Sequence, residues 1–97
     1  MQYMGARAIV NAKEIRDDGS IVEIVIWELD EPLPPCQHRF KYRLFFGMPG
    51  VCWIRYDNER GKGDHRHVGA REEAYYFTTP EALLADFERD VENWRNT

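Results

Sequence analysis

Residues 17–29 read DDGSIVEIVIWEL, a polar turn followed by the most β-prone run in the chain. Asp18 and Gly19 form a strong signal for a short hairpin loop, because both residue types tolerate a positive φ angle. The run at 21–29 is rich in Val and Ile on both of its faces, which is typical of a central strand. The turn therefore predicts a hairpin between this strand and a preceding strand at residues 7–16.

A second pair of strands is predicted beyond a proline-rich loop, DEPLPPC at residues 30–36, where the prolines prevent regular ladder bonding. Residues 38–46 alternate apolar and basic side chains, which predicts a strand with one buried face. The turn GMPG follows, and residues 51–57 return as the partner strand. The polar, glycine-rich residues 58–63 predict an exposed loop.

The end of the chain predicts a helix, preceded by short strands or extended segments at residues 65–68 and 74–77. Thr79 is the predicted N-cap, and Pro80 suits the first helical position because its missing N–H costs nothing there. Apolar residues then recur at helical spacing, and polar residues occupy the other side. The apolar set is Leu83, Leu84, Phe87, Val91 and Trp94, and the polar set is Asp86, Glu88, Arg89, Asp90 and Glu92.

Together these elements predict an α+β fold, in which an antiparallel sheet of four or five strands carries one C-terminal helix packed across it. With 97 residues the chain has room for one core, so we expect a single domain over 1–97, with 1–5 as a ragged tail. The 43% of apolar and 13% of aromatic residues exclude a disordered chain.

Composition also indicates the cellular compartment in which we expect the protein. No run approaches the ~20 apolar residues of a membrane span, and the N-terminus does not resemble a secretory signal. Cys36 and Cys52 lack C-x-x-C spacing and are too few for a disulfide scaffold. We therefore expect two free thiols in a reducing cytoplasm and no structural zinc site. A catalytic thiol would require the fold to bring a histidine beside it.

The net charge of −4 is unevenly distributed. Residues 32–71 carry eight basic and three acidic side chains, and the flanking segments carry five basic and fourteen acidic ones. All three histidines (His38, His65 and His67) lie in the basic middle. This pattern favours a local basic surface that engages one phosphate-rich target. The alternative is that the acidic flanks neutralise the centre through surface ion pairs.

The segment most typical of a functional site is RYDNERGKGDHRH, residues 55–67. Ten of its thirteen residues carry charge or can exchange a proton, so we expect it to be an exposed loop and not part of the core. Its residue types suit general acid–base work on a phosphodiester, with imidazoles to move protons and cations to hold the phosphate. Gly61 and Gly63 would let the backbone approach that phosphate closely.

Three groups of candidate residues follow from this hypothesis. The candidate catalytic residues are His65, His67, Asp57 and Tyr56, the candidate phosphate-binding residues are Arg60, Lys62, Arg66 and Arg55, and a secondary basic face is formed by Arg39, Lys41 and Arg43. We expect five of them to converge on one exposed concave surface: Arg60, Lys62, His65, Arg66 and His67. We also expect the basic strand face to be accessible to solvent and continuous with that surface. No metal and no cofactor is expected.

Other interpretations of the same segment stay open. His65-x-His67 with Asp57 or Asp64 could bind a metal, although neighbouring cations would repel it. The segment could instead be a protein-binding patch of Arg and Tyr, or a loop stiffened by its own ion pairs. The aromatic residues Trp53, Tyr75, Tyr76 and Phe77 are expected in the core rather than as base-stacking platforms.

The segment YDNERGKGDHRH, together with DDGSIVEIVIWEL, FKYRLFFG and TTPEALLADFERDV, resembles the TumE-type toxin family. The resemblance runs from about residue 6 to residue 91, and its most specific part is residues 56–67. It implies a small cytoplasmic toxin of a bacterial or archaeal two-gene toxin–antitoxin module, paired with a helix-turn-helix antitoxin. It assigns no catalytic residue. We expect a toxin that acts on RNA, the ribosome or another phosphate-bearing target through this segment, and a metal-independent endoribonuclease is one enzyme class that fits. The alternative is a non-catalytic module that binds a protein or a nucleic acid.

Overall fold

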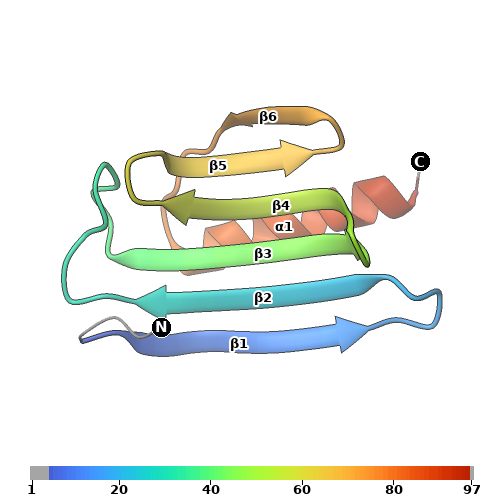
Figure 1. The fold of residues 1–97 in the computed structure, drawn as a ribbon, viewed down its shortest axis with the longest axis horizontal. Helices are drawn as coiled ribbons and strands as arrows, with labels where there is room; N and C mark the ends of the chain where they lie inside the picture. The colour runs from blue at the N-terminus through green and yellow to red at the C-terminus, as the bar shows by residue number, and fades with distance from the viewer. Residues whose placement is uncertain (1–4, 97) are drawn as a thin grey trace.

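The structure, a computed structural model, describes residues 5–96, so four of the five residues of the predicted tail lie outside the described residues. Six strands form one antiparallel sheet in chain order, and one helix lies across it (Figure 1). The elements are β1 (Arg7–Ile15), β2 (Ile21–Glu28), β3 (Phe40–Met48), β4 (Val51–Glu59), β5 (Gly63–Val68), β6 (Arg71–Ala74) and α1 (Pro80–Arg95).

The sheet has six strands, where four or five were predicted. β5 and β6 form a hairpin in which Val68 pairs with Arg71 around a tight turn at Gly69, which adopts a φ of +61°. β6 has the sequence REEA, so its charged residues carried no strand signal. Charged edge strands are common because they discourage pairing with other chains. The strand predicted at residues 74–77 therefore lies three residues earlier, at Arg71–Ala74.

The hairpin between β1 and β2 confirms the interpretation of the Asp-Gly turn. Gly19 has a φ of +88°, and its N–H donates to the carbonyl of Arg16 at 2.9 Å. The Asp18 carboxylate accepts from the Ser20 N–H at 2.8 Å. These local bonds fix the register, so that Ile15 pairs with Ile21.

The helix packs against one face of the sheet, which we call the helix face. Its core side chains come from the three central strands and from α1. They are Ile26, Tyr42, Leu44, Phe46, Ile54, Tyr56, Leu83, Phe87 and Val91. In Figure 1 the helix lies behind β3 and β4, so the reader looks onto the opposite side of the sheet. Within residues 5–96 no helix covers that side.

We call this second side the open face. Because side chains alternate along each strand, the register places on it the residues between the core positions. They include Glu23, Val25, Trp27, Lys41, Arg43, Phe45, Arg55, Asp57, His65, His67 and Glu72. The open face therefore holds both polar and apolar groups without a second layer.

The helix begins as predicted. The Thr79 hydroxyl caps the Ala82 N–H at 3.0 Å, and Pro80 occupies the first turn. One polar position differs from the prediction, because Asp90 is buried and not at the solvent-facing side. No helix within residues 5–96 combines the length and the apolar character required to cross a bilayer.

The predicted loop at 58–63 is shorter than expected. β4 continues to Glu59 and β5 begins at Gly63, so only three residues form the connection. Asn58 is fully buried, and its amide donates to the Phe40 carbonyl at 2.7 Å and accepts from the Tyr42 N–H at 3.0 Å. The segment 55–67 is thus a β-hairpin with two core positions, Tyr56 and Asn58, rather than a loop outside the core.

The predictions for the aromatic residues hold with one exception. Trp53, Tyr75 and Phe77 pack against the core, as expected. Tyr76 is 86% exposed, because it follows β6 and points away from the core.

Candidate functional site

A cluster of polar side chains lies on the open face where β4 and β5 pair. Asp57 is opposite His65, and Arg55 is opposite His67. Side chains at directly paired positions have Cβ atoms about 5 Å apart, so the four groups lie side by side. Glu72 of β6 pairs with His67 and completes what we call the open-face cluster: Arg55, Asp57, His65, His67 and Glu72.

His67 contacts two groups of opposite charge through one nitrogen. Its Nε2 lies 2.7 Å from Nη2 of Arg55 and 3.0 Å from Oε2 of Glu72. A ring nitrogen cannot accept a hydrogen bond from a guanidinium and donate one to a carboxylate at the same time. Protonation of Nε2 therefore favours the contact with Glu72, and deprotonation favours the contact with Arg55.

His65 has a defined tautomer. Its Nε2 lies 2.9 Å from the Lys62 carbonyl oxygen, which can only accept, so Nε2 carries a hydrogen. In the neutral ring the free lone pair is then on Nδ1, which lies 3.8 Å from a Glu72 oxygen. His65 also lines an open hollow of about 410 Å³, together with Lys62, Glu72, Glu73 and Ala74. The lone pair on Nδ1 is what a general base requires.

Arg55 and Asp57 support each other within one strand. Arg55 Nε lies 3.2 Å from Asp57 Oδ2, but its N–H is not directed at an acceptor, so the contact is an ion pair without a hydrogen bond. The Arg55 and Asp57 side chains are both largely buried. Their charges are thus held in place beside the two imidazoles.

The two cations predicted in the loop lie at the turn between β4 and β5. Arg60 and Lys62 are both exposed, and within residues 5–96 neither has an ion-pair partner. The turn requires Gly61, which adopts a φ of +86°. Both cations are therefore available to a ligand next to the hollow at His65.

The secondary basic face continues this surface. Arg43 pairs directly with Asp57 across β3 and β4, its side chain is 48% exposed, and it contacts Glu23 at 3.1 Å. Lys41 is half-buried and donates to the carbonyl of Asn58. Arg39 is exposed just before the strand. The accessibility expected for this strand face is confirmed, and Arg43 connects it to the open-face cluster.

Two of the predicted site residues lie on the other side of the sheet. Arg66 and Tyr56 pair with each other on the helix face, where both contact Asp90 of α1. Arg66 forms two hydrogen bonds to that carboxylate, at 2.8 and 2.7 Å, and a third to Glu73 at 2.7 Å. The expected convergence of five side chains on one concave surface is therefore wrong for Arg66, because neighbours along a strand point to opposite faces. Of the other four, only Lys62 and His65 line the hollow.

The environment of Tyr56 and Asp90 is that of a structural contact. Burial raises the pKa of Tyr56 above its ordinary value, and its hydrogen bond to Asp90 adds to that shift. Burial also raises the pKa of Asp90, but hydrogen bonds from Arg66 and Tyr56 outweigh burial and hold that pKa below its ordinary value. Asp90 is thus a buried carboxylate with all its charge compensated by donors.

A second polar cluster, not predicted from the sequence, surrounds Asp64 on the helix face. Its carboxylate accepts from Tyr42 Oη at 2.6 Å and lies 2.9 Å from His38 Nε2 and 3.5 Å from Cys36 Sγ. Cys36 and His38 come from the proline-rich loop, more than twenty residues earlier in the chain. Only the fold brings them together, and no local sequence signal could have revealed the cluster.

Within residues 5–96 this is the one group of side chains with metal-binding spacing, since ligand atoms of Cys36, His38 and Asp64 lie within 4.8 Å of one another. The Phe40 N–H donates to Nδ1 of His38 at 3.1 Å, so the ring proton is on Nε2, which donates to Asp64. That nitrogen has no lone pair left for a metal. The predicted alternative was His65-x-His67 with Asp57 or Asp64. Asp64 lies on the opposite face, and Asp57, although it is opposite His65, forms no group with ligand spacing among the described residues.

A histidine thus lies beside Cys36, the condition for a catalytic thiol. Burial raises the pKa of the Cys36 thiol, and the nearby Asp64 carboxylate raises it further. A thiolate is the nucleophilic form of cysteine, so these surroundings oppose nucleophilic chemistry. Both cysteines are free, as predicted.

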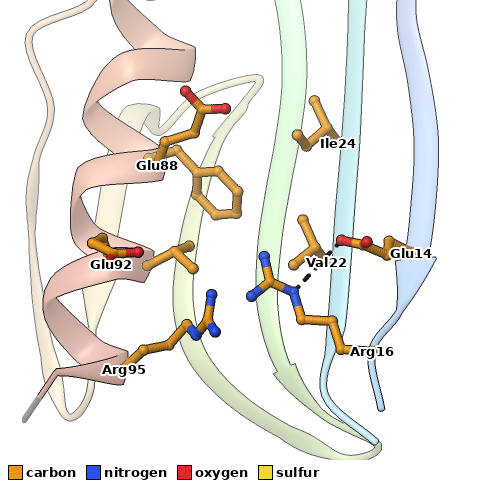
Figure 2. A pocket seen from close by; sticks show the side chains of 9 residues that line it. Glu14, Arg16, Val22, Ile24, Glu88, Glu92 and Arg95 are labelled. Carbon is orange, nitrogen blue, oxygen red and sulfur yellow. Dashed lines mark ion pairs between the residues drawn. The ribbon is translucent and has the colours of Figure 1, made fainter. Parts of the chain in front are cut away.

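The helix leaves a hollow of about 310 Å³ beside β1 and β2 on the helix face (Figure 2). Its floor is apolar and includes Val22 and Ile24, and its rim is charged. Figure 2 shows the Arg16 and Arg95 side chains approaching each other from opposite walls at one end. The hollow exists because one helix cannot cover six strands, since a helix with side chains is about 10 Å wide and strands are about 4.8 Å apart.

The family comparison agrees with the resemblance seen in the sequence. A family model described as Toxin TumE matches residues 5–95. This span includes the whole sheet and both polar clusters. Neither a curated protein nor a solved structure matches the chain significantly. Since the family model covers nearly the entire chain, the protein belongs to the TumE toxin family.

Proposed function

We propose that this toxin acts on RNA, or on another phosphate-bearing target, through the open-face cluster. The observation that carries the proposal is the placement of two histidines on one uncovered sheet face, with Arg55 against His67 and a free lone pair on His65 Nδ1 in its neutral form. His65 and His67 are two residues apart on a strand, which separates their Cα atoms by about 6.6 Å. A single phosphodiester fits between two imidazoles at that spacing.

The proposed reaction is metal-independent cleavage of a phosphodiester. His65 Nδ1 removes the proton from a ribose 2′-hydroxyl, and the 2′-oxygen forms a bond to phosphorus. The bond from phosphorus to the 5′-oxygen breaks, and that oxygen takes the proton held on His67 Nε2. The products are a 2′,3′-cyclic phosphate and a 5′-hydroxyl. Glu72 Oε2, 3.0 Å from His67 Nε2, can accept a hydrogen bond from the proton that this nitrogen carries before the second transfer.

The cations have two different roles in this proposal. Arg55 lies against His67 and is directed by Asp57, so it stabilises charge that develops on the phosphoryl oxygens. Arg60 and Lys62, which are exposed at the turn, hold neighbouring phosphates. Arg66 and Tyr56 take no part in this proposal, because their contacts lie in the helix layer.

Membership of a toxin family implies a cognate antitoxin. We propose that this antitoxin is a helix-turn-helix protein encoded by the neighbouring gene and that the pair acts in the cytoplasm. A second candidate function is non-catalytic binding of a protein or nucleic acid. It is favoured by the ion pair of Arg55 with Asp57, which would hold a rigid binding surface without chemistry.

Expression without the antitoxin tests the proposal. Wild-type protein should arrest bacterial growth, and the double variant His65→Ala, His67→Ala should not. Both side chains are partly exposed, so truncation should cost about 0.5 kcal/mol each and leave the melting temperature nearly unchanged. Arg71→Ala is the matched control, because Arg71 is an exposed residue of the neighbouring strand. Purified wild-type protein should cleave RNA in the presence of EDTA.

Full toxicity of the double variant would refute the acid–base mechanism. If the double variant loses toxicity because it no longer folds, that result would also count against the mechanism. If wild-type protein arrests growth but leaves RNA intact, the non-catalytic binding function is the better one.

A further inference from the structure

The open face carries large apolar side chains that have no covering layer. Trp27 and Val25 of β2 and Phe45 of β3 lie on it and are half-buried, with Val25 between the positions of the two rings. A sheet normally buries an apolar face against a second layer of structure. An apolar group left on an uncovered face, rimmed by polar residues, is typical of a binding surface.

Cations are interleaved with these apolar groups. The register places Trp27 opposite Lys41, and Val25 opposite Arg43. The Arg43 guanidinium lies 5.1 Å from the centre of the Phe45 ring, over its face. Phe45 in turn pairs with Arg55, a member of the open-face cluster. Aromatic and basic side chains thus extend from β2 to the two histidines, with Glu23 and Asp57 among them.

The charge of the two layers indicates what binds here. Helix α1 carries five carboxylates and two guanidinium groups, so the helix side is acidic. The open face holds Lys41, Arg43 and Arg55 together with the histidines. Its carboxylates Glu23, Asp57 and Glu72 are each paired with one of these groups. An anionic ligand would therefore approach the open face, and one that also offers flat rings would match the exposed aromatic side chains.

We propose that the open face binds single-stranded RNA, with bases stacked on Trp27 and Phe45 and phosphates held by Lys41, Arg43 and Arg55. This rests on the proposed function and specifies its substrate. Stacking on a side chain requires an unpaired base, because the bases of a duplex are already stacked on each other. β2 and β5 are three strand spacings apart, about 14 Å. A bound RNA would cross this distance to pass from Trp27 to the histidines.

The test measures binding apart from cleavage. The probe is a short fluorescent oligoribonucleotide with 2′-O-methyl groups, which lacks the hydroxyl that attacks phosphorus. A duplex of the same sequence is the comparison. Wild-type protein should bind the single strand and bind the duplex much more weakly.

Substitution of the two rings should weaken that binding. Trp27→Leu and Phe45→Leu keep an apolar side chain and so protect the fold, and each should weaken single-strand binding by about tenfold, the typical value for one base stacked on one ring. Tyr76→Leu is the matched control, since Tyr76 is an exposed aromatic residue outside the open face, and its affinity should stay unchanged. Arg43→Gln should reduce the slope of log affinity against log salt by about 0.7, as for one lost phosphate contact.

The inference would be overturned by duplex bound as tightly as the single strand, by unchanged affinity in both Leu variants, or by no binding by the wild type. A wild-type dimer that becomes monomeric in the Leu variants would show that the face joins two copies of the chain. Wild-type protein that binds the methylated strand but cleaves no unmodified RNA would refute only the acid–base reaction. Cleavage with an unchanged KM in the Leu variants would refute only the stacking.

Discussion

Arg66 of β5 and Asp90 of α1 form a two-pronged ion pair, with Nε to Oδ2 at 2.8 Å and Nη2 to Oδ1 at 2.7 Å. Asp90 is 6% exposed, and Tyr56 donates a further hydrogen bond to the same carboxylate. The pair joins the helix to the hairpin whose other side carries His65 and His67. One strand, β5, therefore carries both a contact that stabilises the helix layer and the two histidines of the candidate site.

Asp90→Asn should destabilise the fold by about 3 kcal/mol, because it leaves the Arg66 guanidinium without its buried counter-charge. Equilibrium unfolding in urea measures this loss. Arg89→Ala is the control, since Arg89 forms an exposed pair with Asp86 and should change stability by less than about 0.5 kcal/mol. Equal effects of the two changes would contradict a structural role for the buried pair.

Acid should remove the same contribution. The folded-state pKa of Asp90 lies below its ordinary value of 3.8, so the folded state binds fewer protons than the unfolded state. Its contribution to stability is complete above that ordinary value and is lost as the pH falls through the folded-state value. The difference in unfolding free energy between wild type and Asp90→Asn should therefore shrink at low pH. A constant difference across the acid range would rule this out.

Tyr42→Phe should cost about 1–2 kcal/mol, since it removes one donor from the Asp64 carboxylate and leaves the buried site otherwise filled. Urea unfolding with an unchanged m value is the measurement. Tyr76→Phe is the matched change, because the Tyr76 side chain is 86% exposed. The idea fails if both hydroxyl deletions have the same effect.

Gly47→Ala should be strongly destabilising, by about 3 kcal/mol or more. A Cβ at this position would lie 2.0 Å from the Val51 carbonyl oxygen, which is backbone and cannot move aside cheaply. Gly50→Asn is the comparison, since Gly50 has open space around it and Asn tolerates its φ of +76°. Thermal denaturation of both variants checks this, and a stable Gly47→Ala protein would show that the β3–β4 turn adapts.

The two thiols should differ in reactivity with iodoacetamide. Burial raises the pKa of both Cys36 and Cys52, but Cys36 is 8% exposed and also faces the Asp64 carboxylate. Cys36 should therefore react much more slowly than Cys52 in the folded protein and at a similar rate in urea. Mass spectrometry of the alkylated protein resolves the two sites. Rapid labelling of Cys36 under native conditions would mean that the loop around it opens.

Short-range sequence patterns predicted most of the strands and the helix. The Asp18-Gly19 turn, the alternation in residues 38–46 and the Thr79-Pro80 helix start all depend on near neighbours. The turn and the helix start appear where they were predicted, and the strand lies two residues later, at Phe40–Met48. β6 was misplaced because Arg71–Ala74 has no strand signal of its own and exists only by pairing with β5. Pairing across a turn can override weak propensity.

The candidate site was predicted by segment but not by face. Residues 55–67 were identified correctly as an unusual polar stretch, yet their arrangement as a hairpin separates His65 and His67 from Arg66. A loop could have gathered all of these side chains, whereas a strand divides them by alternation. The prediction therefore named residues of both sides as one site.

The sequence by itself determined the hairpin of β1 with β2, the pairing of β3 with β4 and the C-terminal helix, because hydrophobic period and turn residues act over short distances. Only the tertiary structure decided the partners of Asp64 and Asp90 and the side to which each cation points. Those contacts join residues more than twenty positions apart, such as His38 with Asp64 and Arg66 with Asp90. Their formation depends on register and on where the helix lies, and no local pattern contains either.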